Sequence, residues 1–367
     1  VLSAVLMSVS VHAQTKDDAK VSFAYDVDFQ MQFDNREFYR SGFTPSMTIF
    51  GARLTPSVGL AVQQSNGTLH KLMAGIDVMK DFGNSPVSSD RAAADSPETD
   101  NKLSNLKLFR EITLYYSVEK QMGKTGLSLL AGVFPRRFSE GNYSRAFFSD
   151  SLRFYDNNLE GLLIKIRRPK AYYEVGCDWM GMYDTFRRER FMIFSSGEAQ
   201  VTPVLSLGYS AYLYHYSCSR IADGVVDNVL LNPYLKLGFE HLVDIQKLSL
   251  RVGWLQAMQN DRAMVGKYEL FFGKDMMPYY SSVDPAGYTY SNLLYMGSPF
   301  YRVHDDGKSG PGIADRLEVY YSPKIGNPYL DLKVSAIFHF NGNKYSGCRQ
   351  MVSLNFNLQE LLSSRRK

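Results

Sequence analysis

The sequence has no long hydrophobic run, and this absence excludes one class of membrane protein. Nowhere among the 367 residues do eighteen apolar residues follow one another, so no segment is suited to cross a bilayer as a helix. Cysteine is also scarce. Cys177, Cys218 and Cys348 lie far apart and show no CxxC or Cys/His spacing, so we expect no metal site and no cofactor. An odd number of cysteines leaves at least one thiol unpaired, and packing within strands or at a rim is the simpler interpretation.

Strong charge and catalytic motifs are missing as well. The formal net charge is +4, which is too small to indicate a nucleic-acid partner. No GxSxG or HxxEH-type pattern is present, and only six histidines are available. His215, in "YLYHYSCS", lies close to Ser217 and Ser219, and a hydrolase could use that neighbourhood. An interfacial histidine among tyrosines is the simpler account, so we expect that the protein is not an enzyme.

What the sequence does contain is strict alternation, seen first in "VSFAYDVDFQMQF", residues 21–33. Its odd positions are all apolar and its even positions are all small or polar. A period of two indicates an extended strand with one apolar face and one polar face. Thirteen residues exceed the five or six that are usual in soluble sheets. The length satisfies the nine to eleven residues that a strand needs to cross a bilayer.

The same alternation recurs along the chain and predicts an all-β fold, a transmembrane antiparallel β-barrel. Fifteen segments fit the pattern: 21–37, 46–63, 69–82, 108–121, 126–135, 158–168, 171–182, 189–196, 203–217, 227–241, 247–258, 265–276, 315–325, 329–341 and 349–358. A sixteenth strand near 287–296 makes the number even and places the long link 298–314 on the same side as the links 83–107 and 135–157. Outer-membrane barrels have short periplasmic turns and long outer loops. We therefore predict sixteen strands, with fourteen as the alternative, and an outer-membrane location.

The predicted domain organisation is simple. Residues 1–13, ending in "VHA", have the apolar core and small-residue cleavage site of the later part of a signal peptide. Sequencing of the mature protein is expected to begin at Gln14. Residues 14–20 would form a short periplasmic N-terminus, residues 21–358 the barrel, and residues 359–367 a periplasmic tail.

Two stretches resemble a family of known proteins. These are "FDNREFYRSGFTPSMTIFGARLTPSVGL" and "GVFPRRFSEGNYSRAFFSDSLRFYDNNLEGLL", which are similar to porin-like outer-membrane barrel proteins of the Bacteroidota. The resemblance implies a single barrel domain in the outer membrane. It carries no catalytic residues.

The function expected from these observations is passive passage of small solutes, with anionic ones favoured. A barrel of sixteen strands is wide enough for an aqueous lumen, and arginines at a pore mouth favour anions. The candidate pore residues are Arg136, Arg137, Arg145 and Arg153 in the loop 135–157, and Arg53, Glu111, Asp178 and Lys333 on the wall. The apolar residues of that loop predict that it folds into the mouth or lumen. Alternatively, its arginines bind lipopolysaccharide phosphates on the outside.

A second expectation is a non-conducting subunit that binds surface lipoproteins or other outer-membrane barrels through its long loops. A third expectation is an outer-membrane lipid hydrolase. The expected partners are outer-membrane lipid and lipopolysaccharide, together with those lipoproteins or barrels, and no nucleic acid.

Overall fold

The fold was analysed in a computed structural model of the whole chain. The structure describes residues 19–38, 46–83, 109–143, 147–148, 150–220, 224–238, 249–253, 256–261, 269–272, 314–321, 323, 325–327, 329–341 and 344–358. These residues form sixteen strands in one antiparallel sheet, with two short helices, η3 (Arg136–Phe138) and α2 (Asp150–Tyr155), between β5 and β6. None of the helices in this part of the chain is long and apolar enough to cross a membrane.

The strands follow the alternating segments closely. They are β1 (Lys20–Phe38), β2 (Met47–Gln63), β3 (Leu69–Asp81), β4 (Phe109–Met122), β5 (Thr125–Pro135), β6 (Asn158–Arg168), β7 (Ala171–Gly181), β8 (Arg190–Gln200), β9 (Leu205–Tyr216), β10 (Val226–Gly238), β11 (Ser249–Gly253), β12 (Gln256–Asp261), β13 (Glu269–Phe272), β14 (Ala314–Tyr321), β15 (Leu330–Asn341) and β16 (Lys344–Asn357). The all-β prediction is therefore confirmed.

The structure has the predicted number of sixteen strands, but they are not the sixteen predicted segments. The segment expected at 247–258 is divided into β11 and β12, and both pieces pair with β10. The strand expected near 287–296 lies outside the described residues. In the order of the sheet, β13 is the first strand and β14 the last, and β1 pairs with β16 two strands before β14.

The two faces of the sheet are inverted relative to a soluble protein. Large apolar side chains point outward and stay exposed, for example Phe23 at 63% and Ile112 at 62%. Their neighbours in sequence point inward and are buried even where they are charged: Asp26, Asp28 and Asp34 are at most 4% exposed. An apolar outer face around a polar interior is the arrangement of a membrane-spanning barrel. Because barrels of this type belong to outer membranes, we assign the protein to that location.

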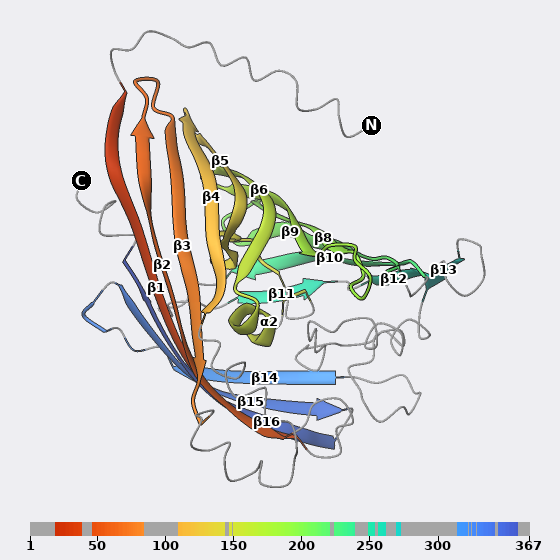
Figure 1. Cartoon of the computed structure of the whole chain (residues 1–367). Coiled ribbons are helices and arrows are strands. Elements are labelled where there is room, and N and C mark those ends of the chain that lie inside the picture. Colours follow the sequence, from red (N-terminus) through yellow and green to blue (C-terminus); the bar gives the residue numbers. More distant parts are fainter. Residues whose placement is uncertain are drawn as a thin grey trace.

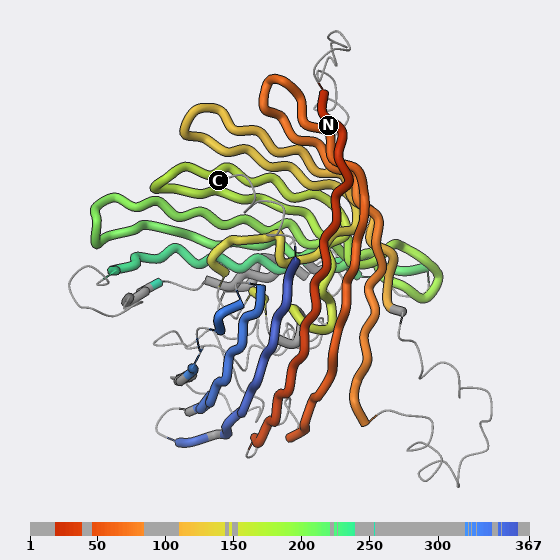
Figure 2. Tube along the Cα trace, turned by 90° about the vertical axis from the view of Figure 1, so that its left-hand side faces the viewer, coloured from red at the N-terminus to blue at the C-terminus, as the bar shows by residue number. Residues whose placement is uncertain are grey.

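The connections define the orientation of the barrel. The links from β2 to β3, β4 to β5, β6 to β7 and β8 to β9 are two to five residues long, and their turns lie side by side along one edge of the sheet (Figure 2). Short turns face the periplasm in such barrels. The opposite end, where β7 and β9 finish, is therefore the outer rim.

The segment 136–157 is hereafter the inner loop, and its described residues leave the outer rim and fold back into the barrel. Figure 1 shows α2, which belongs to this loop, on the concave side of the sheet. Phe147 and Phe154 of the loop are at most 2% exposed. The expectation that this loop enters the lumen agrees with its contacts, which build the interior described next.

Candidate functional site

The inner loop is held at its base by Arg136. One guanidinium nitrogen, Nη2, lies 2.9 Å from Oδ2 of Asp178 on β7 and 3.1 Å from Oδ2 of Asp156. The same nitrogen donates to the carbonyl of Asn158. Arg136 is 6% exposed and Asp178 2%, so both charges are removed from water and depend on each other.

Arg137 makes a second anchor on a different strand, β1. Its guanidinium donates to Asp26 and lies 3.7 Å from Oδ1 of Asp28, both on β1. It also covers the ring of Phe138 at 4.7 Å. Two adjacent arginines thus point in different directions and join the loop to β7 and to β1.

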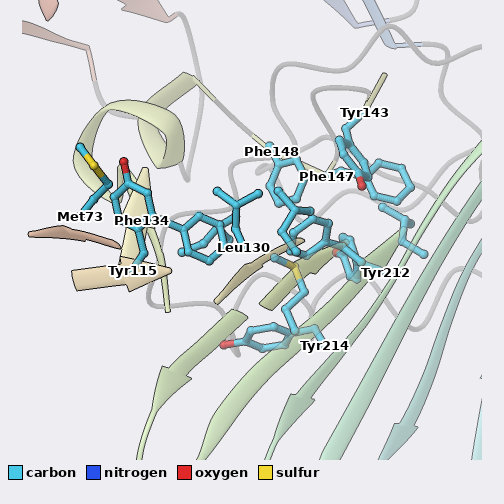
Figure 3. Close-up of a cluster of buried hydrophobic side chains, with 14 of the residues drawn as sticks. Met73, Tyr115, Leu130, Phe134, Tyr143, Phe147, Phe148, Tyr212 and Tyr214 are labelled. Atoms are coloured by element: carbon cyan, nitrogen blue, oxygen red, sulfur yellow. The ribbon is translucent and has the colours of Figure 1, made fainter. Parts of the chain in front are cut away.

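An aromatic cluster fills the space between the inner loop and strands β4 to β10 (Figure 3). From the loop, Phe148 packs edge-on against Tyr143 at 4.7 Å, and Phe147 packs against Tyr212 of β9 at 5.2 Å. Phe194 of β8 contacts both Tyr143 and Phe148. The inward face here is apolar, because β8 and β9 carry hydrophobic residues on both faces. The polar inward face that alternation predicts for strands such as β1 and β15 therefore does not extend across β8 and β9.

Tyr143 marks the junction between the apolar and polar parts of the interior. Burial, with a smaller effect of the Glu174 carboxylate, raises the pKa of Tyr143 far above its ordinary value. Its phenol therefore stays protonated. Glu174 in turn accepts hydrogen bonds from the Ser139 hydroxyl at 2.7 Å and from the Glu140 backbone at 2.9 Å.

The other half of the interior is polar and internally paired. Arg53 on β2 bonds Asp77 at 3.0 Å, and Asn158 donates to Asp77 and to Glu111. Further along β1, Oδ2 of Asp34 forms ion pairs with Nη2 of Arg36 at 2.7 Å and with Nη2 of Arg349 at 2.6 Å. Each of these arginines has a buried carboxylate as its partner.

The candidate pore residues consequently differ in what they can offer to a solute. Arg53, Arg136 and Asp178 are buried in ion pairs, and Glu111 is half-buried against Asn158. Arg137 is mostly covered by its pairs with β1. Arg153 on α2 has an accessible side chain, although the protein around it, with a smaller effect of Arg136, lowers the pKa of its guanidinium. Lys333 places Nζ 4.4 Å from the ring centre of Tyr320. Arg145 lies outside the described residues.

A separate constellation lies on the outward face at the outer rim. His215 of β9 and Asp227 of β10 stand opposite each other in register, with Nδ1 of the imidazole 2.6 Å from Oδ1 of the carboxylate. The His215 ring stacks on Phe191 at 4.7 Å, and Phe191 stacks on Trp179 at 5.4 Å. These four residues form one row across β7 to β10, hereafter the rim row.

Sequence reasoning found His215 but missed Asp227. The two are twelve residues apart, and only the strand register brings them together. A signal was present, since both face outward at the same height if β9 and β10 form a hairpin. Among the described residues, no group of three His, Cys, Asp or Glu side chains is placed to hold a metal ion, and all three cysteines are free and half-buried.

Solved structures with a similar course of the chain are outer-membrane proteins. OpdL of Pseudomonas aeruginosa has a TM-score of 0.42 and 10% identity, over 92% of this chain and 99% of its own. OpdK of the same organism, solved with vanillate, has a TM-score of 0.39 and 8% identity, over 92% of this chain and 98% of its own. A loop-deletion variant of OmpT of Vibrio cholerae has a TM-score of 0.35 and 10% identity, over 93% of this chain and 100% of its own. At these scores the likeness carries no argument about function. No curated protein matches the chain.

A family model does match. Residues 14–222, more than half of the chain, fit the model of the lipid A 3'-O-deacylase-type family. That family is named for an enzymatic activity, which overturns our expectation that the protein is not an enzyme. The resemblance seen in the sequence is confirmed as far as the outer-membrane barrel, while its assignment to the Bacteroidota stays a prediction. Because of the extent of the match, the chain belongs to the lipid A 3'-O-deacylase-type family.

Proposed function

We propose that the protein hydrolyses an ester-linked acyl chain of a lipid A-type glycolipid at its outer rim. The observation that carries the proposal is the His215–Asp227 pair, 2.6 Å apart. It lies on the outward face at the outer rim, beside the stacked rings of Phe191 and Trp179, and aromatic residues of this kind are enriched at membrane interfaces. Family membership supplies the reaction class and the substrate class.

The pair has the chemistry of a general base. A carboxylate that accepts a hydrogen bond from Nδ1–H holds the imidazole in one tautomer and leaves Nε2 unprotonated. Nε2 would take a proton from water as its oxygen attacks the ester carbonyl, and would return that proton to the departing alkoxide. The side chains of His215 and Asp227 are 19% and 14% exposed, so water reaches them while most of each group is covered.

Ser217 is the alternative source of the attacking oxygen. It lies two residues beyond His215, and its backbone is fixed by a hydrogen bond from its N–H to the carbonyl of Glu189 at 2.9 Å. No hydroxyl among the described residues bonds the His215 ring directly, which favours water as the nucleophile.

The test is acyl release from purified lipid A by the detergent-solubilised full-length protein, followed by mass spectrometry. His215→Ala is expected to lower the rate at least 100-fold, the usual contribution of a general base, and Asp227→Asn to lower it as well. Ser217→Ala retains activity if water attacks. His70→Ala is the matched control, because His70 also faces outward, bonds Tyr116 at 2.6 Å, and lies at the opposite end of the barrel. No release by the wild type, or full activity of His215→Ala, would contradict the proposal.

Solute passage is a second candidate. The polar inward face of β1 to β4, β15 and β16 favours it, since an aqueous lumen needs such a lining. The inner loop narrows that lumen, and its two ion-paired arginines have little charge left for a passing anion. Single-channel conductance in a planar bilayer tests this function. A non-conducting role in a complex with lipoproteins or other barrels stays a prediction.

A further inference from the structure

The link between β7 and β8 exposes apolar side chains at the outer rim. It runs over residues 182–189, hereafter the rim loop. Phe186 is 81% exposed and Met182 72%, more than any other large hydrophobic residue in the part of the chain that the structure describes, and Tyr183 is 44% exposed. A phenylalanine this exposed is costly in bulk water and is typical of a site that meets a lipid or protein surface.

Cations accompany these apolar residues. Arg187 of the rim loop and Arg220, beyond β9, are both exposed. Neither forms an ion pair with any of the described residues. The two segments are joined by a hydrogen bond from the Arg220 backbone to the carbonyl of Asp184 at 3.2 Å, so both arginines belong to one surface. This contrasts with the inner loop, where Arg136 and Arg137 are fully engaged.

The rim loop has a defined shape. Within it, the Asp184 N–H donates to the Arg187 carbonyl at 3.1 Å, and the Asp184 side chain accepts from the Thr185 N–H at 2.6 Å. The following strand begins at Arg190, whose guanidinium donates to the Met180 carbonyl at 3.2 Å. Arg187 is therefore presented from an ordered turn.

The rim loop is also continuous with the membrane-facing surface. Gly181 and Arg190 at its base pair with each other, next to Trp179 and Phe191 of the rim row. Aromatic residues at this height mark the interface between acyl chains and headgroups. The exposed cations thus lie just above the hydrocarbon region, where the phosphates of outer-leaflet glycolipids are found.

We propose that the rim loop, with Arg220, binds the phosphate of a phosphorylated glycolipid and so holds that lipid beside the rim row. Guanidinium groups bind phosphate oxygens through two parallel hydrogen bonds, while Phe186 and Met182 cover acyl-chain or sugar surface. The choice of a lipid, rather than a protein, follows from the continuity with the membrane-facing aromatic row. As a description of substrate binding, this inference rests on the proposed function, but the binding itself does not require hydrolysis.

The test is native mass spectrometry of the full-length protein in detergent, titrated with bis-phosphorylated lipid A. The double variant Arg187→Glu/Arg220→Glu is expected to bind at least tenfold more weakly, since two charge-assisted contacts are lost and replaced by repulsion. Arg168→Glu/Lys170→Glu makes the same change of charge at the exposed end of β6 and in the turn that follows it, at the opposite rim. This double variant is the matched control and is expected to bind like the wild type. Phe186→Ser is expected to weaken binding as well.

Three further measurements separate lipid binding from the binding of free phosphate and from hydrolysis. Dephosphorylated lipid A is expected to bind the wild type at least tenfold more weakly, and equal binding would overturn the inference. Displacement of the lipid by an equimolar amount of inorganic phosphate would also overturn it, because the site would then recognise free phosphate alone. In the wild type, absent hydrolysis together with arginine-dependent lipid binding would contradict only the proposed function.

Discussion

Arg136 at the start of the inner loop lies 2.9 Å from Asp178 on β7, and both side chains are buried. A residue of the barrel wall and a residue of a loop that left the wall thus neutralise each other inside the lumen. Removing one member of a buried pair leaves the other charge uncompensated, which usually costs more than the pair contributes.

Arg136→Ala is therefore expected to lower the free energy of unfolding by about 3–5 kcal/mol, and to make the inner loop more susceptible to added protease. Urea unfolding in detergent and limited proteolysis measure the two effects. Arg168→Ala, which removes an exposed arginine at the end of β6, is the control and is expected to change little. Protease resistance equal to that of the wild type would show that the loop is held by its aromatic residues instead.

Phe147 tests the aromatic half of the interior. It is fully buried and packs against Tyr212, so Phe147→Ala removes a whole ring from a closed cluster. A loss of about 3–5 kcal/mol of unfolding free energy is expected. Phe186→Ala removes the same ring from an exposed position and is expected to leave the stability within about 0.5 kcal/mol. Similar losses for the two variants would argue against the inward position of the loop.

Gly176 tests how closely the wall itself is packed. A Cβ at this position would lie 2.3 Å from Cζ of Phe194, and that ring is held by Tyr143 and Phe148. Gly176→Ala is expected to cost about 1–3 kcal/mol through overpacking, measured by urea unfolding. In a Phe194→Ala background the same change should cost much less. If Gly176→Ala lowers the free energy of unfolding equally in both backgrounds, the added methyl group does not clash with Phe194.

Phe29 and Gln30 test the assignment of faces. Phe29 faces outward opposite Leu54, while Gln30 points inward and bonds Asp28 at 2.7 Å. Arg at position 29 is expected to cost about 2–4 kcal/mol if Phe29 lies near the bilayer midplane, and Arg at position 30 far less. Folding into lipid vesicles, read by heat-dependent migration in gels, compares them. Equal losses would mean that the faces are reversed or mixed.

Arg153 tests the selectivity expected of the inner loop. It is the exposed arginine of α2, so a conducting barrel should lose anion preference in Arg153→Glu. Arg137→Glu, by contrast, is expected to disturb folding, because it sets a third carboxylate beside Asp26 and Asp28. Reversal potentials across a salt gradient measure the first effect. A cation-selective or non-conducting wild type would contradict anion selectivity.

The sequence by itself determined the strands and their faces. Alternation over β1 or β15 depends only on the two-residue period of an extended chain and on the contrast between lipid outside and polar groups inside. Both are local properties, so strands were located to within a few residues from β1 to β10. The aromatic residues of the loop 135–157 also predicted that it would not remain in bulk water.

Only the tertiary structure decided which partners meet. Asp178 and Arg136 are 42 residues apart in sequence, as their numbers show, and their pairing depends on where the inner loop enters the lumen. The apolar inward face of β8 and β9 becomes intelligible once Phe147 and Phe148 cover it, since alternation alone expects that face to be wet. His215 and Asp227 meet because β9 and β10 pair in one register. A chain encodes its own period locally, whereas the distance between two side chains is fixed only when strands, turns and loops close on one another.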